Sequence, residues 1–172
     1  MQQETHWLSD AEQGVWRDLM RLVTVLPATL DGQLQRDAGL THFEYLVLAM
    51  LSETPGRSRR MSELAGLVNG SQSRLSHLVG RLERRGLVRR ERTAEDGRGS
   101  VAVLTEAGWD MVVRAAPGHV EHVRSLIFDA LDDAQVGQLG AVLTALLTRL
   151  SPDEACREGT PTAPCAPPEP GC

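Results

Sequence analysis

The feature that most constrains the fold of this chain is an ordered succession of local patterns between residues 61 and 104. Apolar residues recur at helical spacing over Met61 to Val68, which predicts a short helix. Asn69-Gly70 predicts a tight turn, and Ser71 is a suitable N-cap for a second helix that continues to about Arg85. Two helices joined by a short glycine-containing turn are typical of a helix-turn-helix unit.

A two-stranded ribbon is expected directly after the second helix. Gly86 suits the left-handed end of that helix, and Leu87 can fold back onto it. Strands are predicted over Val88 to Glu91 and Val101 to Leu104, joined by the long charged loop Arg92 to Ser100. The sequence therefore predicts a mainly α fold that contains a winged helix-turn-helix domain.

The second helix separates apolar from polar side chains. Leu75, Leu78, Val79 and Leu82 share one face, which is expected to be buried. Side chains of hydrogen-bonding types face away from it, and such side chains read base edges and bind phosphate. Together with the N-cap Ser71, these candidate DNA-binding residues are Gln72, Ser73, Arg74, Ser76, His77 and Arg81.

The charge distribution supports a nucleic-acid partner although the whole chain has a net charge of -5. Between Arg57 and Arg98, eleven arginines stand against five acidic residues, a net charge of +6, and the rest of the chain carries -11. A basic block inside an acidic chain creates one surface that attracts phosphate. A solvated, salt-bridged helix face would give the same charge count, so charge alone leaves that alternative open.

Upstream of this unit, two helices are expected. Apolar residues recur at helical spacing over Leu8 to Leu34, and Pro27 predicts a kink or break inside that stretch. Thr41 and Glu44 have the spacing of a capping box, in which each side chain accepts the other residue's backbone N–H. A helix is therefore predicted to begin at Thr41.

Downstream, the helical period returns at Thr105 and holds to about Leu131, with an interruption predicted at Pro117-Gly118. Asp132 is expected to cap a last helix that ends near Leu150. The apolar face of this last helix is wider than a protomer of this size can cover, which predicts a homodimer. A two-fold dimer implies a pseudo-palindromic DNA operator.

The C-terminal end of the chain shows no helical or strand periodicity. Ser151 to Cys172 holds six of the nine prolines and is predicted to be a disordered tail. All three cysteines, Cys156, Cys165 and Cys172, lie in it, so no disulfide framework is expected.

The longest uncharged run has 15 residues, fewer than the roughly 20 of a membrane span. Since the N-terminus also does not resemble a secretory signal, we expect a cytoplasmic protein that does not insert into membranes.

Five motifs of this chain follow a known pattern: Met61 to Ala65, Ser71 to Val79, Arg81 to Val88, Glu95 to Ser100 and Val103 to Gly108. With these motifs the sequence resembles the MarR family of bacterial transcriptional regulators over about residues 7–150. The resemblance implies that a winged helix-turn-helix region, residues 41–104, is inserted between dimerisation helices in residues 7–36 and 105–150.

The resemblance also assigns roles within the wing. The family's wing motif, an aspartate followed two residues later by an arginine, matches Asp96 and Arg98. It implies that Arg98 enters the minor groove and that Asp96 orients the wing. The sequence departs from the family pattern at Gly80, where an acidic residue is common, and this departure is expected to weaken the recognition helix slightly.

Two further groups of residues are weighed as ligand sites. Trp16 and Tyr45 lie on helices that the family uses around its ligand crevice, so they are candidates for an effector pocket, with core or interface packing as the alternative. His42, His119 and His122 are joined by no cysteine or carboxylate cluster, and we predict no metal and no other cofactor.

The predicted function is that of a sequence-specific DNA-binding transcriptional regulator, a homodimeric repressor released by a small-molecule effector. No nucleophile–base pair, phosphate loop or carboxylate pair stands out, so an enzyme is not expected. Two alternatives remain. The winged domain could be a protein-interaction module that binds an acidic partner, or the tail thiols could make the protein a redox-responsive regulator.

Overall fold

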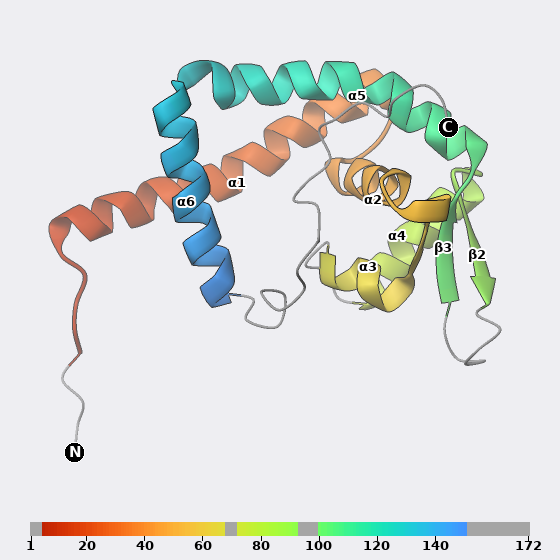
Figure 1. Cartoon of the computed structure of the whole chain (residues 1–172), viewed down its shortest axis with the longest axis horizontal. Coiled ribbons are helices and arrows are strands. Elements are labelled where there is room, and N and C mark those ends of the chain that lie inside the picture. The colour runs from red at the N-terminus through yellow and green to blue at the C-terminus, as the bar shows by residue number, and fades with distance from the viewer. Residues whose placement is uncertain (1–4, 68–71, 93–99, 151–172) are drawn as a thin grey trace.

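The computed structural model describes residues 5–67, 72–92 and 100–150 (Figure 1). Within these residues, six α-helices, three strands and two short 3-10 helices follow one another along the chain. They are α1 (Asp10–Ala38), α2 (His42–Ser52), η1 (Pro55–Arg57), β1 (Ser58–Arg60), α3 (Met61–Leu67), α4 (Gln72–Arg84), β2 (Val88–Arg92), β3 (Ser100–Leu104), α5 (Glu106–Leu126), η2 (Phe128–Ala130) and α6 (Asp133–Leu150).

The three strands form a small antiparallel sheet beside the paired helices α3 and α4. The strand order is β1-β3-β2, so β3 pairs with both neighbours, with Ser58 opposite Val103 and Val88 opposite Leu104. This confirms the predicted mainly α, winged helix fold. The predicted turn at Asn69-Gly70 lies outside the described residues.

The strand β1 was not predicted from the sequence. Its three residues are Ser58, Arg59 and Arg60, and they show no alternation of apolar and polar side chains. They adopt an extended backbone because β3 offers a free edge with which they pair. This strand is thus a consequence of tertiary structure.

The hydrophobic core lies where α2 packs against α1, α5 and the sheet, and where α3 packs on α4. Only the last third of α1 contributes to it, through Leu30 and Leu34. The largest fully buried side chains are Leu34, Leu40, Leu48, Leu51, Leu64, Leu75 and Leu82. The core therefore belongs to the winged region and to the ends of α1 and α5 that adjoin it.

Pro27 and Pro117 both lie inside continuous helices, so the interruption predicted at Pro117-Gly118 is wrong. Of the kink or break predicted at Pro27, the break does not occur. A proline removes one helical hydrogen bond, and the surrounding structure offsets that loss. The helix α1 begins in a Ser9–Glu12 capping box and ends at the left-handed Gly39. In α5, the neighbours Ala115, Ala116 and His119 are buried, and packing holds the helix together.

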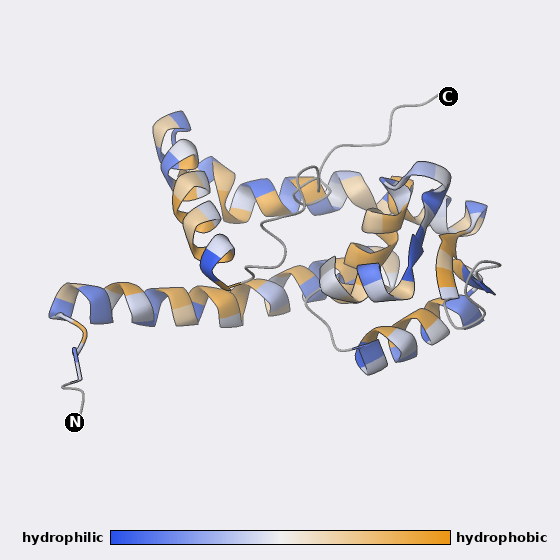
Figure 2. Ribbon diagram, turned by 60° about the horizontal axis from the view of Figure 1, so that its bottom comes forward, coloured by the Kyte–Doolittle hydropathy of each residue, from blue (hydrophilic) through white to orange (hydrophobic). Residues whose placement is uncertain are grey.

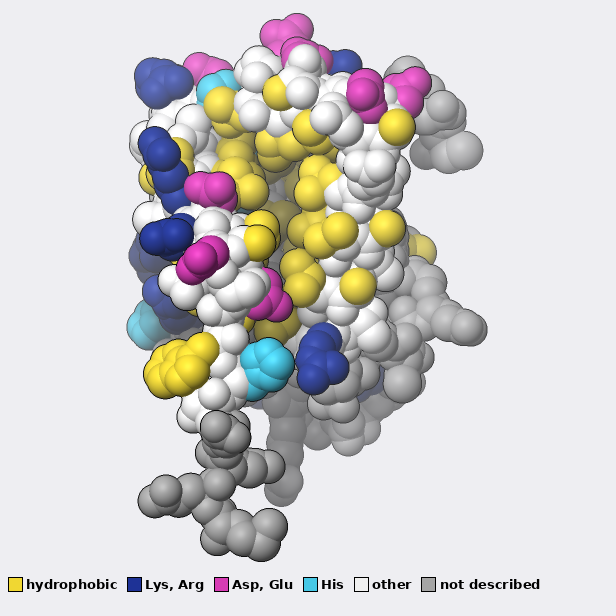
Figure 3. Space-filling model, turned by 90° about the vertical axis from the view of Figure 1, so that its left-hand side faces the viewer, with side chains coloured by type: hydrophobic (Ala, Val, Ile, Leu, Met, Phe, Trp, Pro, Cys, Tyr) yellow, Lys and Arg dark blue, Asp and Glu magenta, His cyan; other side chains and the backbone are white. Residues whose placement is uncertain are grey.

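The helix α6 begins at the predicted cap, since the Gln135 N–H donates to Asp132 Oδ1 at 2.8 Å. It has no buried residue. It follows the end of α5 that is remote from the winged region and does not pack against that region (Figure 1). Hydrophobic residues recur along both α6 and α1 (Figure 2). On the face formed by these two helices, hydrophobic side chains gather around a hollow (Figure 3). The protomer thus exposes an apolar surface that it does not itself cover.

No helix in the described part of the chain combines the length and the apolar character that crossing a membrane requires.

Candidate nucleic-acid interface

The helix α4 has the two faces that the sequence predicted. Leu75, Leu78, Val79 and Leu82 are buried. The candidate DNA-binding residues of this helix are all exposed: Gln72, Ser73, Arg74, Ser76, His77 and Arg81. The other candidates, Ser71, Asp96 and Arg98, lie outside the described residues. The polar face of α4 is therefore exposed, and the sheet lies beside this helix.

The buried carboxylate of Glu44 anchors α4 to α2. Arg81 Nε donates to Glu44 Oε1 at 3.2 Å, and an Arg85 guanidinium nitrogen lies 3.7 Å from Oε2. Glu44 Oε2 also accepts the Thr41 N–H at 3.0 Å, which confirms the predicted capping box. Burial raises the pKa of the Glu44 carboxyl, but the hydrogen bonds from Thr41 and Arg81 more than offset it and leave the pKa below its usual value.

This anchoring role of Glu44 was missed in the sequence, where the residue was recognised only as part of a capping box. Its side chain is 7% exposed, whereas those of Arg81 and Arg85 are 50% and 36% exposed. Arg81 thus uses one edge of its guanidinium for the fold while its other atoms remain available at the surface. A buried acid opposite a basic helix is visible only in three dimensions.

The end of α4 has the predicted left-handed cap. Gly86 has φ of 72°, the Gly86 N–H donates to the Glu83 carbonyl at 2.9 Å, and the Leu87 N–H donates to the Leu82 carbonyl at 3.0 Å. These two bonds are those of a Schellman motif. They fix the direction in which the chain leaves the helix and enters β2.

The start of α5 is locked against this helix end. Thr105 Oγ1 donates to the Gly86 carbonyl at 2.7 Å and accepts the Gly108 N–H at 3.0 Å. A β-carbon at Gly108 would overlap the Leu87 carbonyl oxygen and the Leu104 side chain, so only glycine allows this approach. The long helix α5 is therefore attached firmly to the winged region.

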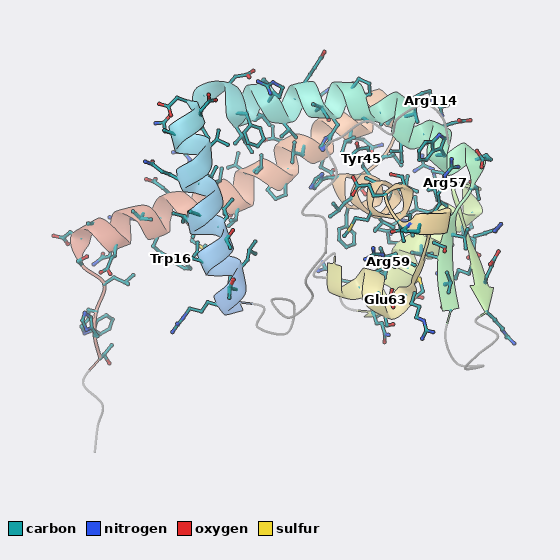
Figure 4. The ribbon with its side chains drawn as sticks, in the orientation of Figure 1. Trp16, Tyr45, Arg57, Arg59, Glu63 and Arg114 are labelled. Atoms are coloured by element: carbon teal, nitrogen blue, oxygen red, sulfur yellow. The ribbon has the colours of Figure 1, made fainter. Side chains whose placement is uncertain are left out.

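Arg57 makes a second attachment to α5 (Figure 4). Its guanidinium carbon lies 3.9 Å from the centroid of a Trp109 ring, and one of its nitrogens lies 3.0 Å from Glu106 Oε1. Arg89 similarly pairs with Glu91 at 2.8 Å. Part of the basic block thus forms ion pairs within the fold, as the salt-bridge alternative supposed.

The structure does not bring Trp16 and Tyr45 together within one protomer. Figure 4 shows Trp16 on the outer half of α1 and Tyr45 on α2, well separated. Trp16 is 52% exposed, whereas Tyr45 belongs to the core and lies 4.6 Å from the His119 ring, centroid to centroid. A pocket lined by both residues of a single protomer is therefore not formed.

Two of the three candidate histidines adjoin each other between α2 and α5. The His42 and His119 rings lie 5.9 Å apart, and His119 is buried. Burial and the neighbouring His42 and His122 lower the pKa of His119 to about 4. No group of three or more His, Cys, Asp or Glu residues in the described part of the chain is placed to hold a metal ion.

The fold and the polar face of α4 place this chain in the class of winged helix-turn-helix DNA-binding proteins. Its similarity to known proteins defines the family. The sequence model described as MarR family matches residues 38–99. The transcriptional regulator HosA of Escherichia coli O157:H7 is 30% identical over 111 residues, which cover 64% of this chain and 74% of that protein.

Two solved structures from Streptomyces coelicolor agree with this result. Sco3205, a MarR family transcriptional regulator crystallised in complex with DNA, is 45% identical, with a TM-score of 0.85 over 89% of this chain and 96% of its own. The MarR family regulator AbsC is 40% identical, with a TM-score of 0.81 over 86% and 99% of the two chains. The chain belongs to the MarR family of transcriptional regulators.

Proposed function

We propose that this chain is a homodimeric, sequence-specific repressor whose DNA binding is released by a small-molecule effector. The observation that carries this proposal is the exposed polar face of α4, supported from behind by four buried apolar residues and held to α2 by the buried Glu44. A helix presented in this way can enter the major groove and contact base edges. The similarity to Sco3205, which was crystallised in complex with DNA, supports the same assignment.

The homodimer is supported by the uncovered apolar surface. Leu143, Leu146, Leu147 and Leu150 of α6 are 43–77% exposed, and Trp16 on α1 is 52% exposed. Surfaces of this kind mark interaction sites, and a second copy related by a two-fold axis would cover both. The two copies of α4 would then read the half-sites of a pseudo-palindromic operator about 10 bp apart.

Within the interface, Arg74 and Arg98 are proposed to act differently. We propose that Arg74, near the start of α4, reads a base, since a bidentate contact with guanine contributes about 1–3 kcal/mol of discrimination. Arg98 at the wing is proposed to enter the minor groove, with Asp96 orienting it, and to add mainly electrostatic affinity. Ser71, Gln72, Ser73, Ser76, His77 and Arg81 complete the proposed contacts.

The dimer can bind DNA only when its two α4 helices have the right spacing. An effector can release the DNA only if it binds the dimer with the wrong spacing more tightly than the dimer with the right one. The helix α5 connects the outer helices to the winged region through Gly108 and Trp109, so a displacement of α5 would move α4. Tyr45 lies at the junction of α2 and α5, next to His119. Tyr45 and Trp16 both remain candidates for an effector contact.

The proposal is tested by selecting binding sites from genomic DNA and then titrating operator and scrambled duplexes at several salt concentrations. Replacing Arg98 by Ala should weaken both duplexes and lower the salt slope by about one unit per protomer. Replacing Arg74 by Ala should weaken the operator selectively. If the wild-type protein binds both duplexes equally, the chain is not a sequence-specific regulator, and a protein-interaction module becomes the better description.

A further inference from the structure

We propose that Arg90, on the wing strand β2, is a positioning residue for DNA recognition. It reaches across the side-chain-free position Gly80 to hold the recognition helix α4 at Ser76 and Glu83, and thereby fixes the angle between that helix and the wing. This inference rests on the proposed DNA-binding function, and it assigns a role to the position where the sequence departs from the family pattern.

The contacts of Arg90 join the two DNA-binding elements at two points. One guanidinium nitrogen of Arg90 donates a short hydrogen bond to the Ser76 backbone carbonyl, and the other lies 3.4 Å from Ser76 Oγ. The Arg90 backbone N–H donates to Glu83 Oε1 at 3.2 Å, and Arg90 Nε lies 3.6 Å from Glu83 Oε2. Ser76 and Glu83 are almost two turns apart on α4, so the strand is attached along the helix and not at a single point.

Gly80 is what makes the contact with Ser76 possible. In an α-helix the side chain of a residue leans toward the N-terminus and covers the turn before it, so a side chain at position 80 would cover the carbonyl of residue 76. A β-carbon built at Gly80 lies 3.4 Å from an Arg90 guanidinium nitrogen and 3.9 Å from an Arg84 nitrogen. A methyl group just fits there, whereas a longer side chain must displace Arg90.

The position of this contact links it to DNA recognition. Ser76 is exposed on the same face as the other candidate base-reading residues, and its carbonyl has a second lone pair free for Arg90 besides the one used by the helix. A planar guanidinium that binds two groups at once holds its partners in a fixed orientation, which a lysine ammonium does not. Arg90 therefore orders α4 relative to β2 before DNA binds, and such preorganisation raises affinity for a matching site.

The experiment compares four variants of the full chain. R90K keeps the charge but loses the two-point contact. G80L keeps every charge and displaces the guanidinium, and G80A is its matched control because a methyl group is tolerated. R89A shows the effect of charge loss alone: it removes one positive charge from the neighbouring residue, whose side chain pairs with Glu91 and, by strand alternation, points to the other face. Leu and Ala both favour helix over Gly, and circular dichroism and thermal unfolding verify that each variant folds.

We expect R90K and G80L each to lower operator affinity by about tenfold, as for loss of one hydrogen bond to a charged group. Binding of the scrambled duplex should change less than about twofold, because non-specific affinity follows charge. G80A should stay close to wild type, and R89A should weaken both duplexes alike. Retention of wild-type operator selectivity by R90K and G80L would overturn the inference, as would an equal loss on both duplexes in R90K.

The outcome also separates this inference from the proposed function. A wild-type protein that prefers its operator, together with variants that keep that preference, refutes only the role of Arg90. A wild-type protein without any preference refutes the DNA-reading function and the positioning role with it.

Discussion

The substitution Glu44→Ala tests how the recognition helix is held in place. Glu44 accepts hydrogen bonds from the Thr41 N–H at 3.0 Å and from Arg81 at 3.2 Å, and its Oε2 lies 3.7 Å from Arg85. Alanine removes the capping contact and leaves both arginines without their carboxylate. The variant is therefore expected to lower the free energy of unfolding and to loosen α4.

The magnitude follows from these contacts. A capping interaction contributes about 1 kcal/mol, and a hydrogen bond to a charged group about 1.5–3 kcal/mol. Removing one member of a buried ion pair can cost about 3–5 kcal/mol when a charge is left buried. Here Arg81 and Arg85 are 50% and 36% exposed and can be hydrated after the loss. We therefore expect a loss of about 2–3 kcal/mol for Glu44→Ala and about 1–2 kcal/mol for Glu44→Gln, which keeps an acceptor for Thr41.

The Glu44 carboxylate also makes the free energy of unfolding depend on pH, and the direction of this dependence follows from its pKa. The folded-state pKa of Glu44 lies below its unfolded value, so its contribution to stability is complete above the unfolded pKa of about 4.3. The contribution is lost as the pH falls through the folded-state pKa. The difference in stability between wild type and Glu44→Gln should therefore shrink below about pH 4.

The assay is urea unfolding followed by tryptophan fluorescence at one fixed protomer concentration, because dimerisation couples stability to concentration. The matched control is Glu12→Ala, which removes the equivalent residue of the Ser9 capping box on α1 but no arginine contact. It should have a clearly smaller effect than Glu44→Ala. If the two variants lose the same stability, the ion pairs with Arg81 and Arg85 contribute nothing and the reasoning fails.

Three further predictions concern other parts of the chain. Gly108→Ala should destabilise the protein by about 2–3 kcal/mol or more, because the added methyl overlaps the Leu87 carbonyl oxygen. A thermal midpoint within about 2 °C of wild type would contradict the close packing of Gly108 against Leu87. Changing Leu143 and Leu146 together to Glu should prevent dimer formation, since charge would be buried in the interface without a partner. Sedimentation velocity measures the oligomeric state, and a variant that is still a folded dimer would show that the interface lies elsewhere. Because the pKa of His119 is lowered to about 4, the unfolded chain takes up a proton near pH 6.5 that the folded chain does not. Stability should therefore fall as the pH decreases from about 6.5 toward 4, and His119→Gln should remove that part of the decrease.

The sequence by itself determined the features that depend on neighbours within one or two turns. The capping box at Thr41, the N-cap at Asp132 and the left-handed Gly86 were all predicted and are present. The apolar face of α4 and the exposed polar face opposite it were also predicted, because helical periodicity alone assigns side chains to faces. These features require only local hydrogen bonding and spacing, which the order of residues encodes directly.

Tertiary structure decided what depends on partners distant in the chain. The polar residues Ser58–Arg60 become a strand only because β3 supplies an edge, and α1 and α5 continue through their prolines because caps and packing offset one lost hydrogen bond. The pairing of Glu44 with Arg81 joins residues 37 positions apart, and Arg90 reaches Ser76 only because β2 crosses α4 at Gly80. Periodicity predicts which face of a helix is buried, but the partner on that face is set by how the elements pack in space.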